Sequence, residues 1–140
     1  MPLPYSQPPS LADIEELAQE VFATLPSVLT ARCDGLVIRV EDFPEDEVLE
    51  DMGIDSPYDL AGLYQGVPLT RQEISHPRPA IDMVFLYRRP LLDWWCEEEI
   101  ELEALIRHVL IHEIGHHFGF SDDDMERIEA SFAGDGPENQ

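Results

Sequence analysis

Lysine is absent from this chain of 140 residues, and its eight basic residues are all arginines. Thirty acidic residues oppose them, so the formal net charge is −22. A surface this acidic repels the phosphates of nucleic acids and the headgroups of anionic lipids. We therefore expect neither nucleic acid nor a membrane surface as a partner, and we expect any peptide or protein that binds to be basic.

Long apolar runs and cysteines are also scarce. The chain has no run of 18 apolar residues, which argues against a transmembrane helix. Residues 1–10 lack the basic start and the apolar segment of a signal peptide, so the expected location is the cytoplasm. The two cysteines, Cys33 and Cys96, do not form a CxxC pair, and we expect two buried, reduced thiols.

The length and the 44% content of hydrophobic residues suit one compact domain. We expect this domain to span residues 10–133, between a proline-rich arm at 1–9 and a polar tail at 134–140. The length does not specify the oligomeric state, and a monomer is compatible with it.

Hydrophobic spacing predicts both helices and strands. Apolar residues recur at helical spacing after Ser10, a good N-cap, and before Pro26. Short β-branched runs predict strands, and a glycine- and proline-rich connection separates two of them. The expected elements are a helix at 11–24, a strand at 35–41, helical turns at 44–52, an irregular connection at 53–79 with a short strand near 62–64, a strand at 80–87, an apolar knot at 91–95, one helix at 97–118 and a last helix at 123–132.

The sequence His112-Glu113-x-x-His116 lies within the predicted helix 97–118. Two side chains four residues apart rise on the same face of a helix, so both imidazoles can reach one Zn²⁺. Glu113 projects about 100° further around the helix, where it can reach a water on the metal rather than the metal itself. This is the placement that a general base needs.

A catalytic zinc usually has three protein ligands, so a third must come from elsewhere. Gly119 can end the helix and turn the chain, and Asp122 follows three residues later. We expect Asp122 as the third ligand, with Glu126 as the alternative. His108 continues the stripe of histidines and is expected to support the site or to be exposed. The competing interpretation is that the histidines are ordinary surface residues and that Asp122 only caps the last helix.

The pattern His112-Glu113-x-x-His116-x-x-Gly119-x-x-Asp122 resembles the bacterial minimal zincin family of metallopeptidases, once described as a domain of unknown function. The segments 60–69 and 86–92 also look like that family, so the resemblance covers about residues 10–133. It implies an α+β fold with a small mixed sheet, an N-terminal helix, an active-site helix and a short C-terminal helix. It also implies zinc bound by His112, His116 and Asp122, with Glu113 as catalytic base.

Two functions follow as hypotheses. The first is a zinc-dependent metallopeptidase, in which the strand at 81–87 pairs with an extended substrate and Tyr64 or Tyr87 stabilises the oxyanion. The second is a protein-binding module that keeps the zincin scaffold with little or no catalysis. The histidine spacing also resembles ribosomal-RNA-maturing metalloendonucleases. These have a third histidine in place of Asp122 and lack the glutamate at 113, and the charge of −22 disfavours RNA.

Overall fold

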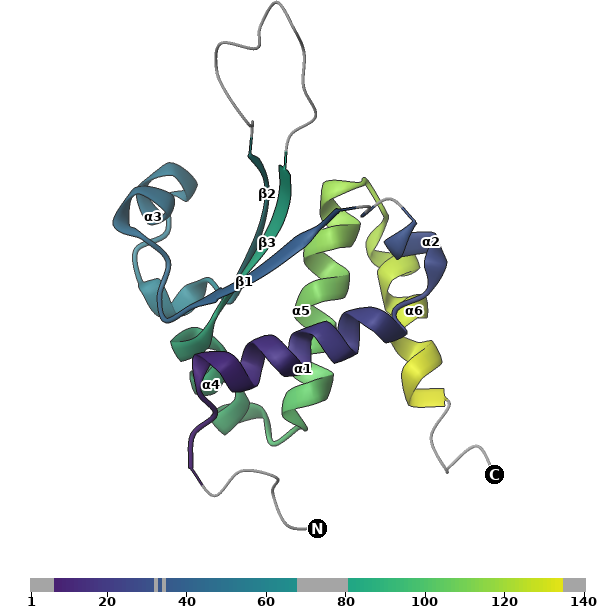
Figure 1. The fold of residues 1–140 in the computed structure, drawn as a ribbon, viewed down its shortest axis with the longest axis horizontal. Coiled ribbons are helices and arrows are strands. Elements are labelled where there is room, and N and C mark those ends of the chain that lie inside the picture. The colour runs from purple at the N-terminus through teal and green to yellow at the C-terminus, as the bar shows by residue number, and fades with distance from the viewer. Residues whose placement is uncertain (1–6, 32, 34, 68–80, 135–140) are drawn as a thin grey trace, which may run out of the picture.

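Three strands form a mixed sheet around which the helices are arranged (Figure 1). The structure is a computed structural model and describes residues 7–31, 33, 35–67 and 81–134. The strands are β1 (Val37–Glu41), β2 (Gly62–Val67) and β3 (Ile81–Tyr87), in the spatial order β1-β3-β2. β3 pairs in parallel with β1 and antiparallel with β2, so the last strand in the sequence lies in the middle. This arrangement confirms the expected α+β fold and its small mixed sheet.

Helices lie before, between and after these strands in the sequence. They are α1 (Leu11–Thr24), α2 (Ser27–Thr30), α3 (Asp46–Met52), the 3₁₀ turn η1 (Pro57–Asp59), α4 (Arg88–Glu98), α5 (Leu102–His117) and α6 (Asp122–Gly134). α1 begins after Ser10, the N-cap that the sequence suggested, and a capping box closes this end: Asp13 N–H donates to the Ser10 hydroxyl, and the Asp13 carboxylate accepts from Ser10 N–H.

The prediction of one long helix at 97–118 is wrong, because two helices, α4 and α5, share this stretch. α4 begins directly after β3, with Pro90 in its first turn, where a missing N–H costs nothing. The supposed apolar knot at 91–95 is therefore helical. Glu99 ends α4 in the left-handed conformation, at φ 55°. The acidic run 97–99 thus lies at the negative end of α4, which disfavours continuing that helix.

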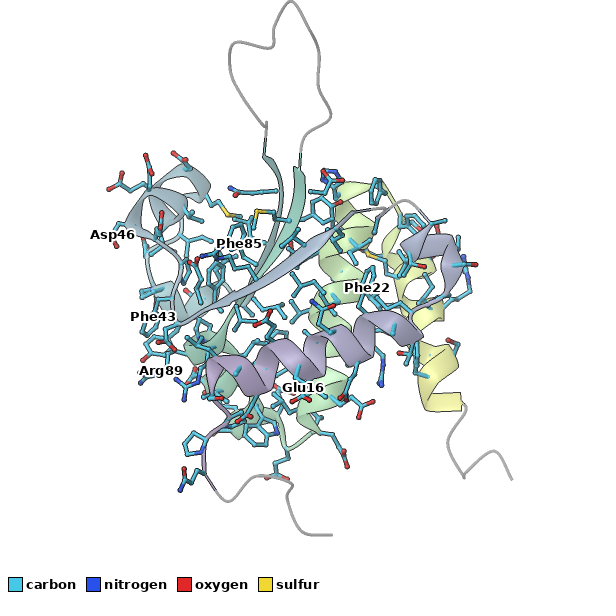
Figure 2. The ribbon with its side chains drawn as sticks, viewed as in Figure 1. Glu16, Phe22, Phe43, Asp46, Phe85 and Arg89 are labelled. Carbon is cyan, nitrogen blue, oxygen red and sulfur yellow. The ribbon has the colours of Figure 1, made fainter. Side chains whose placement is uncertain are left out.

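The main core lies on one face of the sheet, where α1 and α5 pack against the strands and each other, whereas α3 lies on the other side (Figure 1). Figure 2 shows Phe22 on the side of α5 and α6, and Phe85 on the side of α3. Alternation along β3 separates the two sets, because Val84 and Leu86 are fully buried in the main core. On the α3 side Arg89 lies over the ring of Phe43, at 5.6 Å from its centroid.

α5 approaches β2 so closely that one position needs glycine. A Cβ at Gly62 would lie 2.6 Å from Cγ1 of Val109 and 3.5 Å from Cγ of Glu113. Real side chains do not approach this closely, so glycine at 62 lets the two elements meet. The contact brings Glu113 directly beside the backbone of β2.

The two cysteines differ in exposure. Cys33 is buried, but Cys96 is exposed, so the expectation of two buried thiols is wrong for Cys96.

Most of the expected arm and tail, and residues 68–79 of the irregular connection, fall outside the described residues. Within the described part of the chain, no helix has both the length and the apolar character to cross a membrane.

Gly62→Ala is expected to lower the free energy of unfolding by about 1–3 kcal/mol, because the added methyl group overlaps Val109. Urea unfolding of the metal-free protein measures the change. Val109→Ala removes the overlapping atom, so the double variant should lose less stability than the sum of the two single variants. Simple additivity, or an unchanged Gly62→Ala protein, would contradict the close contact.

Candidate metal centre

The candidate site lies on α5, which is held between the sheet and α6. Successive residues of a helix are about 100° apart, so residues four apart differ by about 40°. Val109 and Glu113 face β2, since both lie beside Gly62. Gly115 faces α6, because a Cβ there would lie 2.4 Å from Sδ of Met125. The stripe His108, His112 and His116 runs between these two sides, with His108 toward α6 and His116 toward the sheet.

A tight turn brings α6 back against α5. Gly119 adopts φ 81°, Phe120 N–H donates to Gly115 O at 2.8 Å, and Gly119 N–H donates to His116 O at 3.2 Å. This is the pattern of a Schellman motif, and it ends α5 where the sequence predicted. The hydroxyl of Ser121 then accepts from Asp124 N–H at 3.0 Å and caps α6. Met125 is consequently fully buried, as core rather than as part of a metal site.

Glu113 has the environment of a general base. Burial raises the pKa of its carboxyl group above its ordinary value. His116, the backbone N–H of Tyr64 and His112 act in the opposite direction, because they stabilise the carboxylate. The net effect is a pKa above the ordinary value for a glutamate, so the group accepts a proton more readily than an exposed carboxylate does.

His116 and Asp122 come together across the turn. Nε2 of His116 lies 3.6 Å from Oδ1 of Asp122, and both side chains are largely exposed. The distance is longer than a hydrogen bond. It is close to the roughly 3.3 Å that separates two ligands of one tetrahedral zinc with bonds of about 2.0–2.1 Å. The pair is thus spaced as two ligands of a single ion would be.

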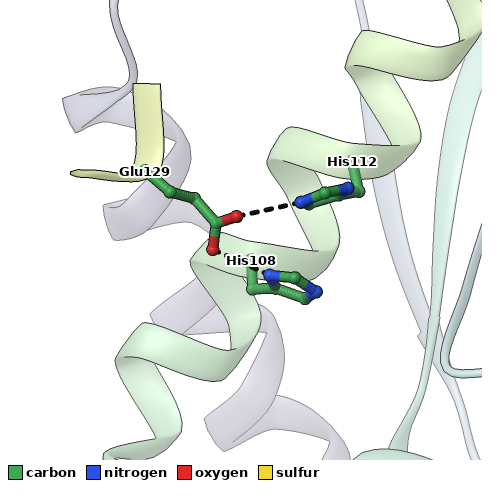
Figure 3. Close-up of side chains that lie close together, drawn as sticks. All are labelled: His108, His112 and Glu129. Carbon is green, nitrogen blue, oxygen red and sulfur yellow. Dashed lines mark hydrogen bonds and ion pairs between the residues drawn. The ribbon is translucent and has the colours of Figure 1, made fainter. Parts of the chain in front are cut away.

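His112 is engaged elsewhere (Figure 3). The carboxylate of Glu129, on α6, accepts from Nε2 of His112 at 2.9 Å and from Nδ1 of His108 at 2.7 Å. Trp94 packs edge-on against the ring of His108, at 5.6 Å between centroids. His108 is therefore a member of a polar cluster rather than a merely exposed residue.

The predicted ligands are brought together only in part. In the described residues, the group of three potential ligands whose atoms all lie within 4.8 Å is His108, His112 and Glu129, which shares only His112 with the predicted set. The rings of His112 and His116 are 5.8 Å apart between centroids. Glu126, the alternative ligand, is exposed on α6. The sequence interpretation missed Glu129, although a carboxylate four residues after Met125 lies near the buried stripe of this helix.

The donor atoms around His112 suit a metal such as zinc. Imidazole nitrogens and carboxylate oxygens are its common ligands in proteins, together with thiolates. Each of the two neighbouring sets offers two imidazoles and one carboxylate: His112, His116 and Asp122 toward the turn, and His108, His112 and Glu129 toward α6. The chemistry of the residues present therefore fits the ion that this kind of motif implies.

Both tyrosines considered for the oxyanion have other partners in the structure. The hydroxyl of Tyr64 donates to Oδ2 of Asp82 at 2.9 Å, and its ring stacks on His117 at 3.9 Å between centroids. Tyr87 is 2% exposed and stacks on Phe85, on the face of the sheet toward α3. Of the two, Tyr64 alone lies on the side of α5.

The expectation that the strand at 81–87 pairs with an extended substrate is wrong. β3 is hydrogen-bonded to β1 on one side and to β2 on the other, so it has no free edge for a substrate strand. β2 is an edge strand of the described sheet, and it is the strand that contacts Glu113. A substrate that adds to the sheet beside the base would therefore pair with β2.

Comparison with known proteins identifies the family of this chain. Residues 33–131 match the family described as zincin-like metallopeptidase, and the chain belongs to that family. Among solved structures, a conserved hypothetical protein from Thermus thermophilus is similar. It shares 19% sequence identity, with a TM-score of 0.46, over 86% of this chain and 94% of that one. No curated protein matches the sequence.

The burial of Tyr87 predicts a pH dependence of stability. Burial raises its pKa from 10 to about 12, and the acids Glu41, Glu45 and Glu113 add to this. The folded state thus holds the phenol proton more tightly than the unfolded state. Its contribution to stability is complete below pH 10 and is lost as the pH rises through 12. Tyr87→Phe should therefore reduce the fall in the free energy of unfolding over this range. An identical alkaline profile in urea unfolding would count against a buried Tyr87.

Proposed function

We propose that this protein is a zinc-dependent metallopeptidase in which His112, His116 and Asp122 hold the ion and Glu113 is the general base. The observation that carries the proposal is the position of Glu113. It lies one residue beyond His112 on α5, partly buried against β2, with a raised pKa. Membership of the zincin-like metallopeptidase family supports the same reaction class.

The chain's own groups would act in a simple sequence. When bound, zinc acts as a Lewis acid that acidifies water and polarises the scissile carbonyl. Glu113 takes a proton from the attacking water, whose oxygen forms a bond to the carbonyl carbon. Glu113 then passes this proton to the leaving amine nitrogen as the C–N bond breaks. The backbone N–H of Tyr64 holds the carboxylate in place, because it donates to Glu113.

The substrate is proposed to be an extended peptide segment of basic character. An extended chain can add to the edge of β2 through backbone hydrogen bonds, which would bring it beside Glu113. The acidic surface favours basic side chains on that peptide, since the net charge of the protein is −22.

Glu113→Gln should reduce kcat/KM by about 10²–10⁴-fold on peptides cleaved by the zinc-loaded wild type, because an amide cannot accept the proton. A mixture of unbiased peptides analysed by mass spectrometry identifies those substrates. Glu103→Gln is the matched control, since Glu103 lies in the first turn of the same helix and pairs with Arg107. Retained cleavage in Glu113→Gln would remove this mechanism, and a chelator should abolish cleavage by the wild type.

The choice of third ligand can be tested in the same assay. Asp122→Asn is expected to lower kcat/KM at least about tenfold at a fixed zinc concentration, because it weakens one of three ligands. Glu126→Gln, at an exposed position of the same helix, should have little effect. The reverse result would assign the third ligand to Glu126.

A further inference from the structure

We propose that His108, His112 and Glu129 form a second position for a divalent metal ion, and that this position competes with the peptidase position for His112. The second position would take zinc or a similar ion, such as Co²⁺, that accepts two imidazoles and one carboxylate. Its existence does not depend on peptidase activity. Only the competition rests on the proposed function.

The three donor atoms already converge. Nδ1 of His108, Nε2 of His112 and the carboxylate of Glu129 lie within 4.8 Å of one another (Figure 3). Both imidazoles now point at the same carboxylate, at 2.7 and 2.9 Å. The two imidazoles contact different oxygens of Glu129, and an ion inserted among them needs about 3.3 Å between its ligand atoms, so each of these two contacts must open by roughly half an ångström. Small rotations of the side chains are sufficient for this.

The surroundings favour a metal position over an ordinary surface cluster. All three ligands stand on helices, and Met125 against Gly115 fixes α6 on α5 close to them. The ring of His108 is also held by Trp94. The side chains are 37%, 24% and 28% exposed, so an ion and its remaining water molecule can enter. The carboxylate offsets part of the ion's charge, which two neutral imidazoles alone would not do.

Competition follows from the central place of His112. Its Nε2 has one lone pair, and it can bind one ion at a time. His108 lies about 40° from His112 toward α6, whereas His116 lies about 40° in the other direction, toward the sheet and Glu113. An ion held with Glu129 is therefore displaced from the base. The second position is unproductive for hydrolysis and withholds His112 from the first.

The deciding experiment titrates metal into a variant without the peptidase position. His116→Ala/Asp122→Asn removes two of its three ligands and leaves His108, His112 and Glu129 intact. Titration with Co²⁺, followed by its visible absorption and by displacement with Zn²⁺, should show one ion per chain. Adding Glu129→Gln should weaken the affinity by more than about 100-fold, the upper range for an outer-shell partner. Glu126→Gln is the matched control on α6 and should change it less than about threefold.

The outcomes distinguish a failure of the second position from a failure of the proposed peptidase. If the double variant binds no ion while the wild type does, the second position is refuted and the proposed peptidase is untouched. Binding by the double variant, together with a zinc-loaded Glu129→Gln single variant that cleaves no peptide, supports the second position and refutes the peptidase, because this single variant lacks the competing position. Equal losses from Glu129→Gln and Glu126→Gln would mean that general charge holds the ion, which also refutes the assignment. Should the double variant fail to fold, Asp122→Asn alone provides the background for the same comparison.

Discussion

The close packing of α5 between β2 and α6 is the constraint on which the rest of the structure depends. Two glycines make it possible, Gly62 on the strand and Gly115 on the helix itself. Because both neighbours come so near, the faces of α5 have separate roles. On one face of α5, Glu113 packs against the sheet. On the opposite face, Met125 of α6 packs against Gly115, and the histidines lie between these two faces. The geometry of the site is thus a consequence of where side chains of a neighbouring element can pack directly against glycine.

His112 stands at the boundary between two environments. On one side are a partly buried carboxyl with a raised pKa and the exposed pair His116 and Asp122. On the other side is Glu129, which the structure shows in contact with His112. A single side chain is therefore available to two donor sets of the same composition. The first set is the one proposed for hydrolysis, whereas the atoms of the second set already lie close together in the structure.

Local sequence patterns predicted many elements of this molecule. They failed where the position of a residue depends on how separate elements pack together. The helical spacing of apolar residues predicted α1, Gly119 predicted the end of α5, and short β-branched or apolar runs predicted β1 and β3. The break between α4 and α5 depends on Glu99, which adopts a left-handed conformation that is usual for glycine. The sequence pattern does not predict this conformation at a glutamate. Glu129 was missed because its approach to His108 depends on the angle of the turn after α5. The central position of β3 was not predicted, because the residue pattern of a strand does not specify which strands pair with it.

The pairing of β3 with β1 also has a consequence for how the site assembles during folding. All the histidine and carboxylate donors lie within residues 108–129, on two helices joined by a short turn, so they can meet through contacts that are local in sequence. The surroundings of Glu113 require β2, which is held by β3, and β3 in turn pairs with a strand more than 40 residues earlier. Local contacts form quickly, and those that close long loops form slowly. When the whole chain folds, the histidine and carboxylate side chains should therefore gather before Glu113 reaches its buried setting against β2.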